Sequence, residues 1–202
     1  MPTSAIAALI LAGGQSSRLG HDKALHPWQG IPLLARVTAV AQSLTPQVYV
    51  LTPWPERYRA IVGAPVTWLA EAEPGAGPLG ALGEGLAQLS AQRPVDWVLA
   101  LACDLPRLEG RQLRAWSDRL ASLPPQHLAL VPRVGDRWEP LCAFYRPAAL
   151  GPLRDFQAQG GRAFQRWLAT LPLTALDLDA EVAAMLWNCN TAADFLEETS
   201  WG

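Results

Sequence analysis

The 202-residue chain has little cysteine and little histidine. Its three cysteines lie too far apart for a CxxC metal site, and an odd number favours a reducing compartment, so we expect a cytoplasmic protein. The three histidines show no HxH or HxxxH spacing, which argues against a histidine metal site. No apolar run approaches the roughly 20 residues that a membrane helix needs, so we expect no membrane contact.

An excess of charge of either sign is also missing. Sixteen basic residues stand against 18 acidic ones, and no cluster of basic residues appears. Nucleic-acid binding needs a basic surface that neutralises phosphates, so we expect no nucleic-acid partner. Half of the residues are apolar, and a chain of this length can bury a core of its own, so we predict a single domain over residues 1–202.

Lysine is nearly absent. Of the 16 basic residues 15 are arginine, and Lys23 is the only lysine. A compact ammonium that persists in a chain otherwise built with arginine suggests a chemical constraint on that position. Lys23 is therefore a candidate functional residue, and the alternative is a surface lysine without a role.

Apolar runs alternate with amphipathic stretches along the chain. Six runs predict strands, several of them apolar on both faces as in a parallel sheet: 5–11, 47–52, 66–69, 96–102, 128–132 and 141–145. Four stretches with apolar residues at helical spacing predict helices: 32–44, 78–90, 109–123 and 161–171. The alternation predicts an α/β fold with three layers, a doubly wound, mostly parallel and Rossmann-like sheet, and ligand sites beyond the carboxyl ends of its strands.

The loop after the first predicted strand has the composition of a phosphate-binding loop. Gly13 and Gly14 leave backbone N–H groups accessible, and Arg18 and Lys23 add two cations. The spacing matches neither the GxxxxGK[ST] loop nor the dinucleotide motif GxGxxG. Two bare glycines alone would fit a tight strand exit equally well, but the combination with the cations favours phosphate binding.

Residues 11–25, LAGGQSSRLGHDKAL, resemble the signature LAGGxSxRMGxDK of the molybdenum cofactor guanylyltransferases, with Leu19 in place of the usual Met. Similar pieces follow in the same order: GPLGAL at 77–82, CDLP at 103–106, EPL at 139–141 and NCNT at 188–191. The resemblance implies the nucleotidyltransferase fold, which sugar-phosphate nucleotidylyltransferases share. It also implies an Mg²⁺-dependent enzyme that transfers GMP from GTP to the terminal phosphate of molybdopterin and releases pyrophosphate.

The expected chemistry and the resemblance favour the same catalytic residues. Attack of one phosphate on another gathers negative charge, which calls for cations, a divalent metal and fixed geometry. We predict that Lys23 and Arg18 bind phosphates and that Asp104, which follows the fourth strand, binds Mg²⁺. The alternatives are a surface salt bridge for Arg18 and the N-cap of a short turn for Asp104.

The resemblance implies nucleotide contacts at Leu11, Ala12, Gly13, Gly14, Lys23, Thr52, Glu71 and Asp104. Glu71 follows the third strand, where a carboxylate can accept hydrogen bonds from N1 and N2 of guanine, although a solvated loop charge is an equal alternative. Relatives often carry Asn after the second strand, and this chain has Thr52, which leaves that base contact open. Asp22 is expected to orient Lys23 or to cap a helix and not to bind metal.

For the acceptor side, the resemblance implies contacts of the pterin with Glu139, Pro140, Asn188 and Asn190, although Asn190 can equally cap the last helix. The expected partners are GTP and molybdopterin, with or without its molybdenum, and transient contacts with cofactor-delivery or acceptor enzymes.

Three other functions stay open. A cytidylyltransferase of the same cofactor would be expected to read LAAG where this chain reads LAGG. A sugar-phosphate nucleotidylyltransferase fits the NCNT and DK pieces less well. A GTP-binding module without catalysis would need neither Lys23 nor Asp104.

Overall fold

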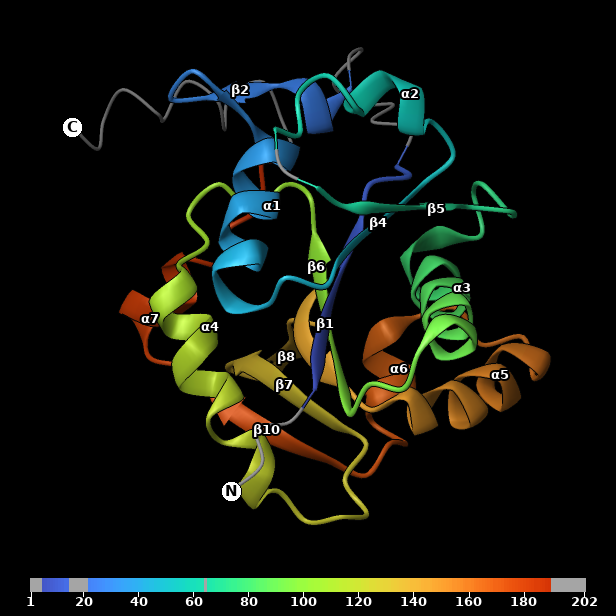
Figure 1. Ribbon diagram of the computed structural model, residues 1–202. Helices are drawn as coiled ribbons and strands as arrows, with labels where there is room; N and C mark the ends of the chain where they lie inside the picture. The colour runs from blue at the N-terminus through green and yellow to red at the C-terminus, as the bar shows by residue number, and fades with distance from the viewer. Residues whose placement is uncertain (1–4, 15–21, 64, 190–202) are drawn as a thin grey trace.

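The computed structural model describes residues 5–14, 22–63 and 65–189. In these residues a central sheet is covered by helices on both faces, and a small hairpin of β2 (Pro27–Trp28) and β3 (Ile31–Pro32) lies at the top in Figure 1. Among the described helices, none combines the length and the apolar character needed to cross a lipid bilayer.

The sheet has eight strands in the order β10-β7-β9-β6-β1-β4-β5, with β8 paired to β7. Strands β6, β1, β4 and β5 run parallel to their neighbours in this group, while β9 runs antiparallel to both β6 and β7. The strands are β1 (Ile6–Leu11), β4 (Val48–Thr52), β5 (Thr67–Ala70), β6 (Trp97–Ala102), β7 (Ala129–Val134), β8 (Arg137–Trp138), β9 (Cys142–Tyr145) and β10 (Leu173–Asp177).

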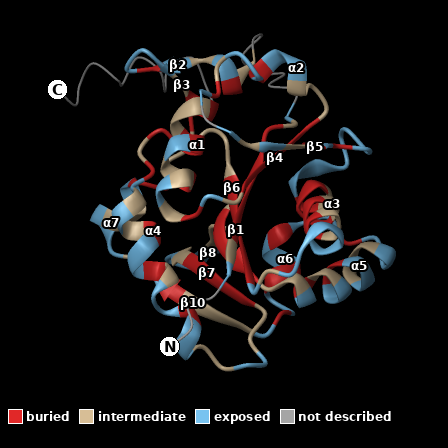
Figure 2. Ribbon diagram, viewed as in Figure 1, coloured by how far each residue is buried: buried red, intermediate tan, exposed pale blue. Residues whose placement is uncertain are grey.

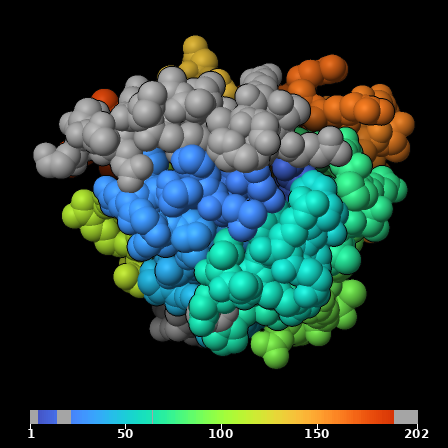
Figure 3. All heavy atoms as spheres, turned by 90° about the horizontal axis from the view of Figure 1, so that it is seen from above, coloured from blue at the N-terminus to red at the C-terminus, as the bar shows by residue number. Residues whose placement is uncertain are grey.

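Strand β1 lies where the direction of the crossovers reverses. Leu11, its last residue, pairs with Leu51 of β4 on one side and with Ala102 of β6 on the other. Helix α1 leads from β1 to β4, and helix α3 leads from β5 to β6. Ligand sites of doubly wound sheets form at such reversals, beyond the carboxyl ends of the strands. Figure 3 looks down on this edge, where the blue segment after β1 and the cyan segment around α2 lie side by side.

Helices cover both faces of the sheet (Figure 1), and short 3-10 helices lie in the chain between the other elements. The helices are α1 (Leu33–Leu44), α2 (Pro55–Tyr58), α3 (Gly77–Gln92), α4 (Gly110–Ser117), α5 (Leu150–Ala158), α6 (Phe164–Leu168) and α7 (Ala180–Ala184). The 3-10 helices span Lys23–Leu25, Leu120–Ser122 and Pro147–Ala149.

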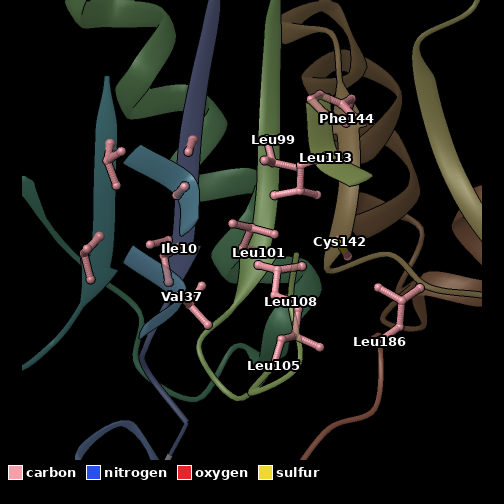
Figure 4. Close-up of a cluster of buried hydrophobic side chains, with 14 of the residues drawn as sticks. Ile10, Val37, Leu99, Leu101, Leu105, Leu108, Leu113, Cys142, Phe144 and Leu186 are labelled. Carbon is pink, nitrogen blue, oxygen red and sulfur yellow. The ribbon is translucent and has the colours of Figure 1, made fainter. Parts of the chain in front are cut away.

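Alternate residues of the central strands face two different cores, which is why these strands are buried along their length in Figure 2. On one face, Ile10 packs in a cluster that includes Val37 of α1 and Leu113 of α4 (Figure 4). On the other face, Leu9 packs in a cluster that includes Leu86 of α3 and Trp167 of α6. Both cores therefore share one sheet, whose carboxyl edge is left to the loops.

The structure confirms the α/β fold and the mostly parallel, doubly wound sheet. All six predicted strands are present, and their bounds differ from the predicted ones by at most two residues. The helices predicted at 32–44 and 78–90 are α1 and α3. These elements were visible in the sequence because their buried residues follow the strand and helix periods closely.

Two predicted helices are shorter than expected. The helix predicted at 109–123 ends at Ser117, and the chain tightens into a 3-10 turn that buries Leu120 in the same cluster as Trp116. The helix predicted at 161–171 is only α6, because the main chain after Leu168 forms turns that lead into β10. The helical spacing of apolar residues continues through these turns, and for this reason the predicted lengths of both helices were too long.

Helix α5 and strand β10 were not predicted from the sequence. Helix α5 holds Gly151 and Pro152 in its first turn, both unfavourable in a helix interior, and buries Leu153 alone. Strand β10 is a half-exposed edge strand, so its apolar pattern is weak. The antiparallel direction of β9 follows from its short connection to β7, which is too short for a crossover helix.

Candidate functional site

A cleft of about 480 Å³ opens at the carboxyl edge of the sheet, among the ends of β1, β5 and β6. Its walls are residues 11–14, 22–24, 71, 75, 77, 78, 81, 102–104 and 141. Of the residues predicted to bind nucleotide, the structure brings together along this cleft Leu11, Ala12, Gly13, Gly14, Lys23, Glu71 and Asp104.

Lys23 and Asp104 form an ion pair in the cleft. The Lys23 Nζ lies 3.4 Å from the Asp104 Oδ2, and the two side chains are 19 % and 17 % exposed. Burial raises the pKa of the Asp104 carboxyl, and the nearby Lys23 ammonium opposes this rise. The pair brings a cation and a carboxylate, 81 residues apart in sequence, to one place beside the glycines of the first loop.

Asp22 caps the 3-10 helix that begins at Lys23, as predicted. Its Oδ1 accepts a hydrogen bond from the backbone N–H of Ala24 at 3.1 Å. Its Oδ2 accepts a hydrogen bond from the buried Tyr58 hydroxyl of α2 at 2.7 Å. Burial, reinforced by Asp22, raises the pKa of Tyr58, so this hydroxyl stays a donor. Because both carboxylate oxygens are used, Asp22 fixes the start of the segment that carries Lys23.

Glu71 lies directly against the backbone of Gly13. A Cβ on Gly13 would lie 1.8 Å from the Glu71 Oε2, so the close approach of the two residues requires glycine at this position. The Glu71 residue is only 8 % exposed, and its Oε2 has no hydrogen-bond partner among the described residues. Burial, and to a lesser degree the charge of Glu84, raises the pKa of Glu71. This carboxyl group is an unsatisfied polar group in the wall of the cleft.

Thr52 lies behind the cleft and is absent from its walls. Its hydroxyl donates to the carbonyl oxygen of Ala12 at 2.8 Å and accepts from the N–H of Trp54 at 3.2 Å. Its carbonyl oxygen accepts a hydrogen bond from the N–H of Glu71 at 3.3 Å. Thr52 therefore ties the ends of β1, β4 and β5 together, and the nucleotide contact predicted for it stays a prediction.

Three of the predicted acceptor residues, Glu139, Pro140 and Asn188, lie beside the cleft and do not form its walls. The Pro140 carbonyl oxygen accepts a hydrogen bond from the Tyr145 hydroxyl at 2.8 Å, and burial raises the pKa of Glu139. Asn188 precedes Cys189, whose N–H donates to the Asp104 carbonyl oxygen at 3.1 Å. The segment around Asn188 thus reaches the loop that carries Asp104. Arg18 and Asn190 lie outside the described residues.

Several residues of the cleft were not predicted from the sequence. Gly75 and Gly77 have φ values of +95° and +80°, which favour glycine in the turn that leads into α3. Cys103 lies beside Asp104, and burial raises the pKa of its thiol, so it stays neutral. The motifs GPLGAL and CDLP marked these segments, but nothing in them distinguishes a wall residue from a neighbour.

Within the part of the chain that the structure describes, no three His, Cys, Asp or Glu side chains gather into a metal site made by protein alone. A single carboxylate in a phosphate-binding cleft is nevertheless a donor set that Mg²⁺ uses, because Mg²⁺ takes its remaining ligands from phosphates and water. Asp104 lines the cleft and could serve as such a carboxylate, whereas each oxygen of Asp22 already accepts one hydrogen bond within the protein.

Known proteins resemble the chain over most of its length. The model of the family described as "MobA-like NTP transferase domain" matches residues 8–174. The chain is 45 % identical over 189 residues to a probable molybdenum cofactor guanylyltransferase of Trichormus variabilis, covering 94 % of this chain and 88 % of the relative. It is 33 % identical over 185 residues to the molybdenum cofactor guanylyltransferase of Pseudomonas aeruginosa, covering 89 % of each.

Solved structures share the fold at much lower identity. The molybdopterin-guanine dinucleotide biosynthesis protein A of Archaeoglobus fulgidus superimposes with a TM-score of 0.76 at 18 % identity, covering 96 % of this chain and 97 % of that one. The 4-diphosphocytidyl-2C-methyl-D-erythritol synthase of Anaerococcus prevotii superimposes with a TM-score of 0.72 at 9 % identity, covering 98 % and 96 %. These two likenesses concern the fold alone.

Proposed function

Because this chain belongs to the MobA-like NTP transferase family, with molybdenum cofactor guanylyltransferases among its relatives, we propose that it transfers GMP from GTP to the terminal phosphate of molybdopterin. The product is the guanine dinucleotide form of the cofactor, and pyrophosphate is released. The observation that carries the proposal is the Lys23–Asp104 pair, which lines one cleft together with Gly13, Gly14 and Glu71.

The reaction exchanges one phosphoanhydride linkage for another. An oxygen of the terminal phosphate of molybdopterin attacks the α-phosphorus of GTP and forms a new P–O bond. The bond between the α-phosphorus and the bridging oxygen to the β-phosphate breaks, and its electron pair leaves with pyrophosphate. The reaction needs no protein nucleophile, so the protein contributes charge and position.

Lys23 stabilises the negative charge that grows on the leaving pyrophosphate. Its ammonium is a compact charge at the end of a flexible chain, so it can follow the phosphates during the reaction. Asp22 and Tyr58 hold the segment from which it projects. Arg18 belongs to the same loop and serves as the second phosphate-binding cation in this proposal.

Asp104 and the phosphates of GTP would hold Mg²⁺, which neutralises phosphate charge when bound. The ion pair with Lys23 favours the ionised, metal-binding form of Asp104 against the burial that disfavours it. The residues present fit the metal, since Asp104 faces the cleft and its side chain keeps 17 % of its surface exposed.

Glu71 selects the base. Guanine presents two adjacent donors, N1–H and the 2-amino group, which a carboxylate can accept together, and cytosine and adenine offer no such pair. The Glu71 Oε2 is buried in the wall of the cleft without a hydrogen-bond partner among the described residues, which supports this role. On the acceptor side, the proposal places the pterin near Asn188, beside the Asp104 loop. The cytoplasmic location and the contacts with delivery enzymes stay predictions from the sequence.

A nucleotide panel tests the proposal. Pyrophosphate release is followed from GTP, CTP, ATP and UTP with Mg²⁺ and molybdopterin, beside a parallel set with sugar phosphates as acceptors. Turnover with GTP and the pterin alone is the expected result. Turnover with CTP, or only with a sugar phosphate, would assign the protein to a neighbouring branch. GTP binding without pyrophosphate release from any acceptor would make it a binding module.

A further inference from the structure

Two side chains of α3 reach back to the main chain on either side of Glu71. The Glu84 Oε1 accepts a hydrogen bond from the Ala72 N–H at 2.6 Å. The Gln88 Nε2 donates to the Ala70 carbonyl oxygen at 2.8 Å and to the Glu84 Oε1 at 3.0 Å. Glu84 and Gln88 are one helical turn apart, so they face the same segment together. We call this pair of residues the α3 clamp.

The α3 clamp completes a frame around Glu71. The N–H of Glu71 itself donates to the Thr52 carbonyl oxygen at 3.3 Å, and the Thr52 hydroxyl donates to the Ala12 carbonyl oxygen at 2.8 Å. The main chain at Glu71 is thereby held before, at and after the residue. Through the Ala12 carbonyl oxygen the same frame includes the residue that precedes Gly13. The Glu71 carboxylate lies against the backbone of Gly13.

The frame is needed because the following segment has little packing of its own. Residues 72–78 are all exposed, so buried apolar contacts do not fix their position. The Glu71 carboxylate has only narrow space, since a Cβ at Gly13 would already collide with it. A hydrogen-bonding site loses much of its selectivity when its groups shift by a fraction of an ångström.

We propose that Glu84 and Gln88 are positioning residues for base selection, and that they hold Glu71 so that its carboxylate meets the hydrogen-bond donors of a 6-oxopurine. The inference rests on the proposed function in one respect, the contact of Glu71 with the base. Neither clamp residue belongs to the walls of the cleft, so their hydrogen bonds act on Glu71 through the main chain at Ala70 and Ala72. The charge of Glu84 also acts on Glu71, and Glu84→Gln and Glu84→Ala remove it equally, so a difference between these two variants reports the hydrogen bonds.

The chemistry of the clamp offers a conservative replacement. Glu84 only accepts hydrogen bonds here, from Ala72 and Gln88, and both bonds use its Oε1. In Glu84→Gln the amide oxygen can accept both, whereas Glu84→Ala removes them. Gln88→Ala removes the bond to Ala70, and Gln92→Ala changes an exposed glutamine at the far end of α3 as the matched control.

The experiment measures the dissociation constants of GTP and ITP in the presence of Mg²⁺ by isothermal titration calorimetry. ITP lacks the 2-amino group that Glu71 is proposed to accept. We expect Glu84→Ala and Gln88→Ala each to weaken GTP binding about three- to tenfold, the effect of one lost hydrogen bond, and to affect ITP less. Glu84→Gln and Gln92→Ala keep the wild-type preference for GTP over ITP, and melting temperatures verify that every variant is folded.

The outcomes separate the clamp from the function on which it rests. If Glu71→Ala abolishes the preference for GTP and folded Glu84→Ala and Gln88→Ala retain it, the clamp is overturned and the role of Glu71 stands. If Glu71→Ala leaves the preference unchanged, both roles are overturned. The dissociation constants are measured without an acceptor. A failure of the pyrophosphate assay with molybdopterin would therefore contradict the proposed transfer, and the GTP and ITP dissociation constants would still test the clamp.

Discussion

Single side chains determine the electrostatics of the cleft. Lys23 stood out in the sequence as the only lysine, and the structure places it in an ion pair with Asp104 with 19 % of its side chain exposed. The structure therefore contradicts a fully exposed surface lysine at this position, and the functional role of Lys23 stays a prediction. Lysine and arginine differ in shape and hydration, so we expect a chain that uses arginine elsewhere to keep lysine where the difference matters.

The first prediction at this scale concerns the ion pair. We expect Lys23→Ala and Asp104→Ala each to lower turnover at least about a hundredfold, since in the proposed reaction Lys23 contacts the phosphates and Asp104 holds the Mg²⁺ that neutralises their charge. Pyrophosphate release under saturating GTP measures the effect, and circular dichroism shows that the fold is retained. Arg93→Ala, which removes an exposed cation after the far end of α3, is the control and should keep wild-type turnover.

A second prediction follows from the raised pKa of Glu71. The folded protein favours the protonated carboxyl, so this group's contribution to stability is full below its ordinary pKa of 4.5 and is lost as pH rises through the raised, folded-state value. We therefore expect Glu71→Gln to gain stability relative to wild type as pH rises above about 4.5. Urea unfolding across pH measures the difference.

Asp104 and Glu139 also have raised pKa values, but they are present in both proteins, so their effects cancel in this difference. Glu73→Gln, which neutralises an exposed carboxylate on the following loop, controls for the loss of one negative charge. A stability difference between Glu71→Gln and wild type that stays constant across pH would contradict the prediction.

At the scale of elements, α3 both covers the sheet and supports the cleft. Gly77, Pro78 and Ala81 near its N-terminus belong to the cleft walls, and its middle packs on β1. The close approach to β1 depends on Gly85, where a Cβ would lie 2.4 Å from the Cδ2 of the fully buried Leu9. Gly85 thus allows α3 to pack closely on β1, while Glu84 and Gln88 of the same helix bind the main chain at the end of β5.

This contact predicts a change of sign in a double mutant. Gly85→Ala should lower the free energy of unfolding by about 1–3 kcal/mol, since the extra methyl group overpacks a buried leucine. In a Leu9→Ala background the space is open, and the same change should stabilise the protein by up to about 1 kcal/mol through helix propensity. Urea denaturation of the four proteins measures both effects, and additive changes would show that Leu9 and Gly85 do not interact.

Most helices and strands could be predicted from the sequence, but the contacts between them could not. Strands β1, β4 and β6 and helices α1 and α3 repeat apolar residues over whole turns or whole strands, which local periodicity detects. The edge strand β10 and the short helices α2 and α7 bury few residues and gave no signal. The hydrogen bond of Tyr58 with Asp22 joins residues 36 positions apart, and no local pattern reports it.

At the scale of the whole molecule, one sheet joins two cores. The cluster around Ile10 and the cluster around Leu9 lie on opposite faces of the same strands, so neither can lose its packing without exposing the sheet to water. The prediction of a single domain therefore has a physical consequence, which is that both faces should unfold together.

We expect Leu34→Ala on one face and Leu86→Ala on the other to lower the free energy of unfolding by about 2–5 kcal/mol each, because both side chains are fully buried. Urea transitions followed by far-ultraviolet circular dichroism and by tryptophan fluorescence should coincide in both variants. Trp116 lies in the core of one face and Trp167 in the core of the other, so the fluorescence signal includes both faces. Two separated transitions, one for each face, would contradict the single domain.

The sequence by itself determined the class of the fold, the central strands and the loop that carries Lys23, because apolar periodicity and glycine placement act over short distances along the chain. It also marked Asp104 and Glu71, each as a carboxylate directly after a strand. Only the tertiary structure decided that Lys23 meets Asp104, that Glu71 lies against Gly13 and that α3 holds Glu71. These contacts join residues far apart in the chain, and their geometry depends on the register of the sheet and the seating of the helix upon it.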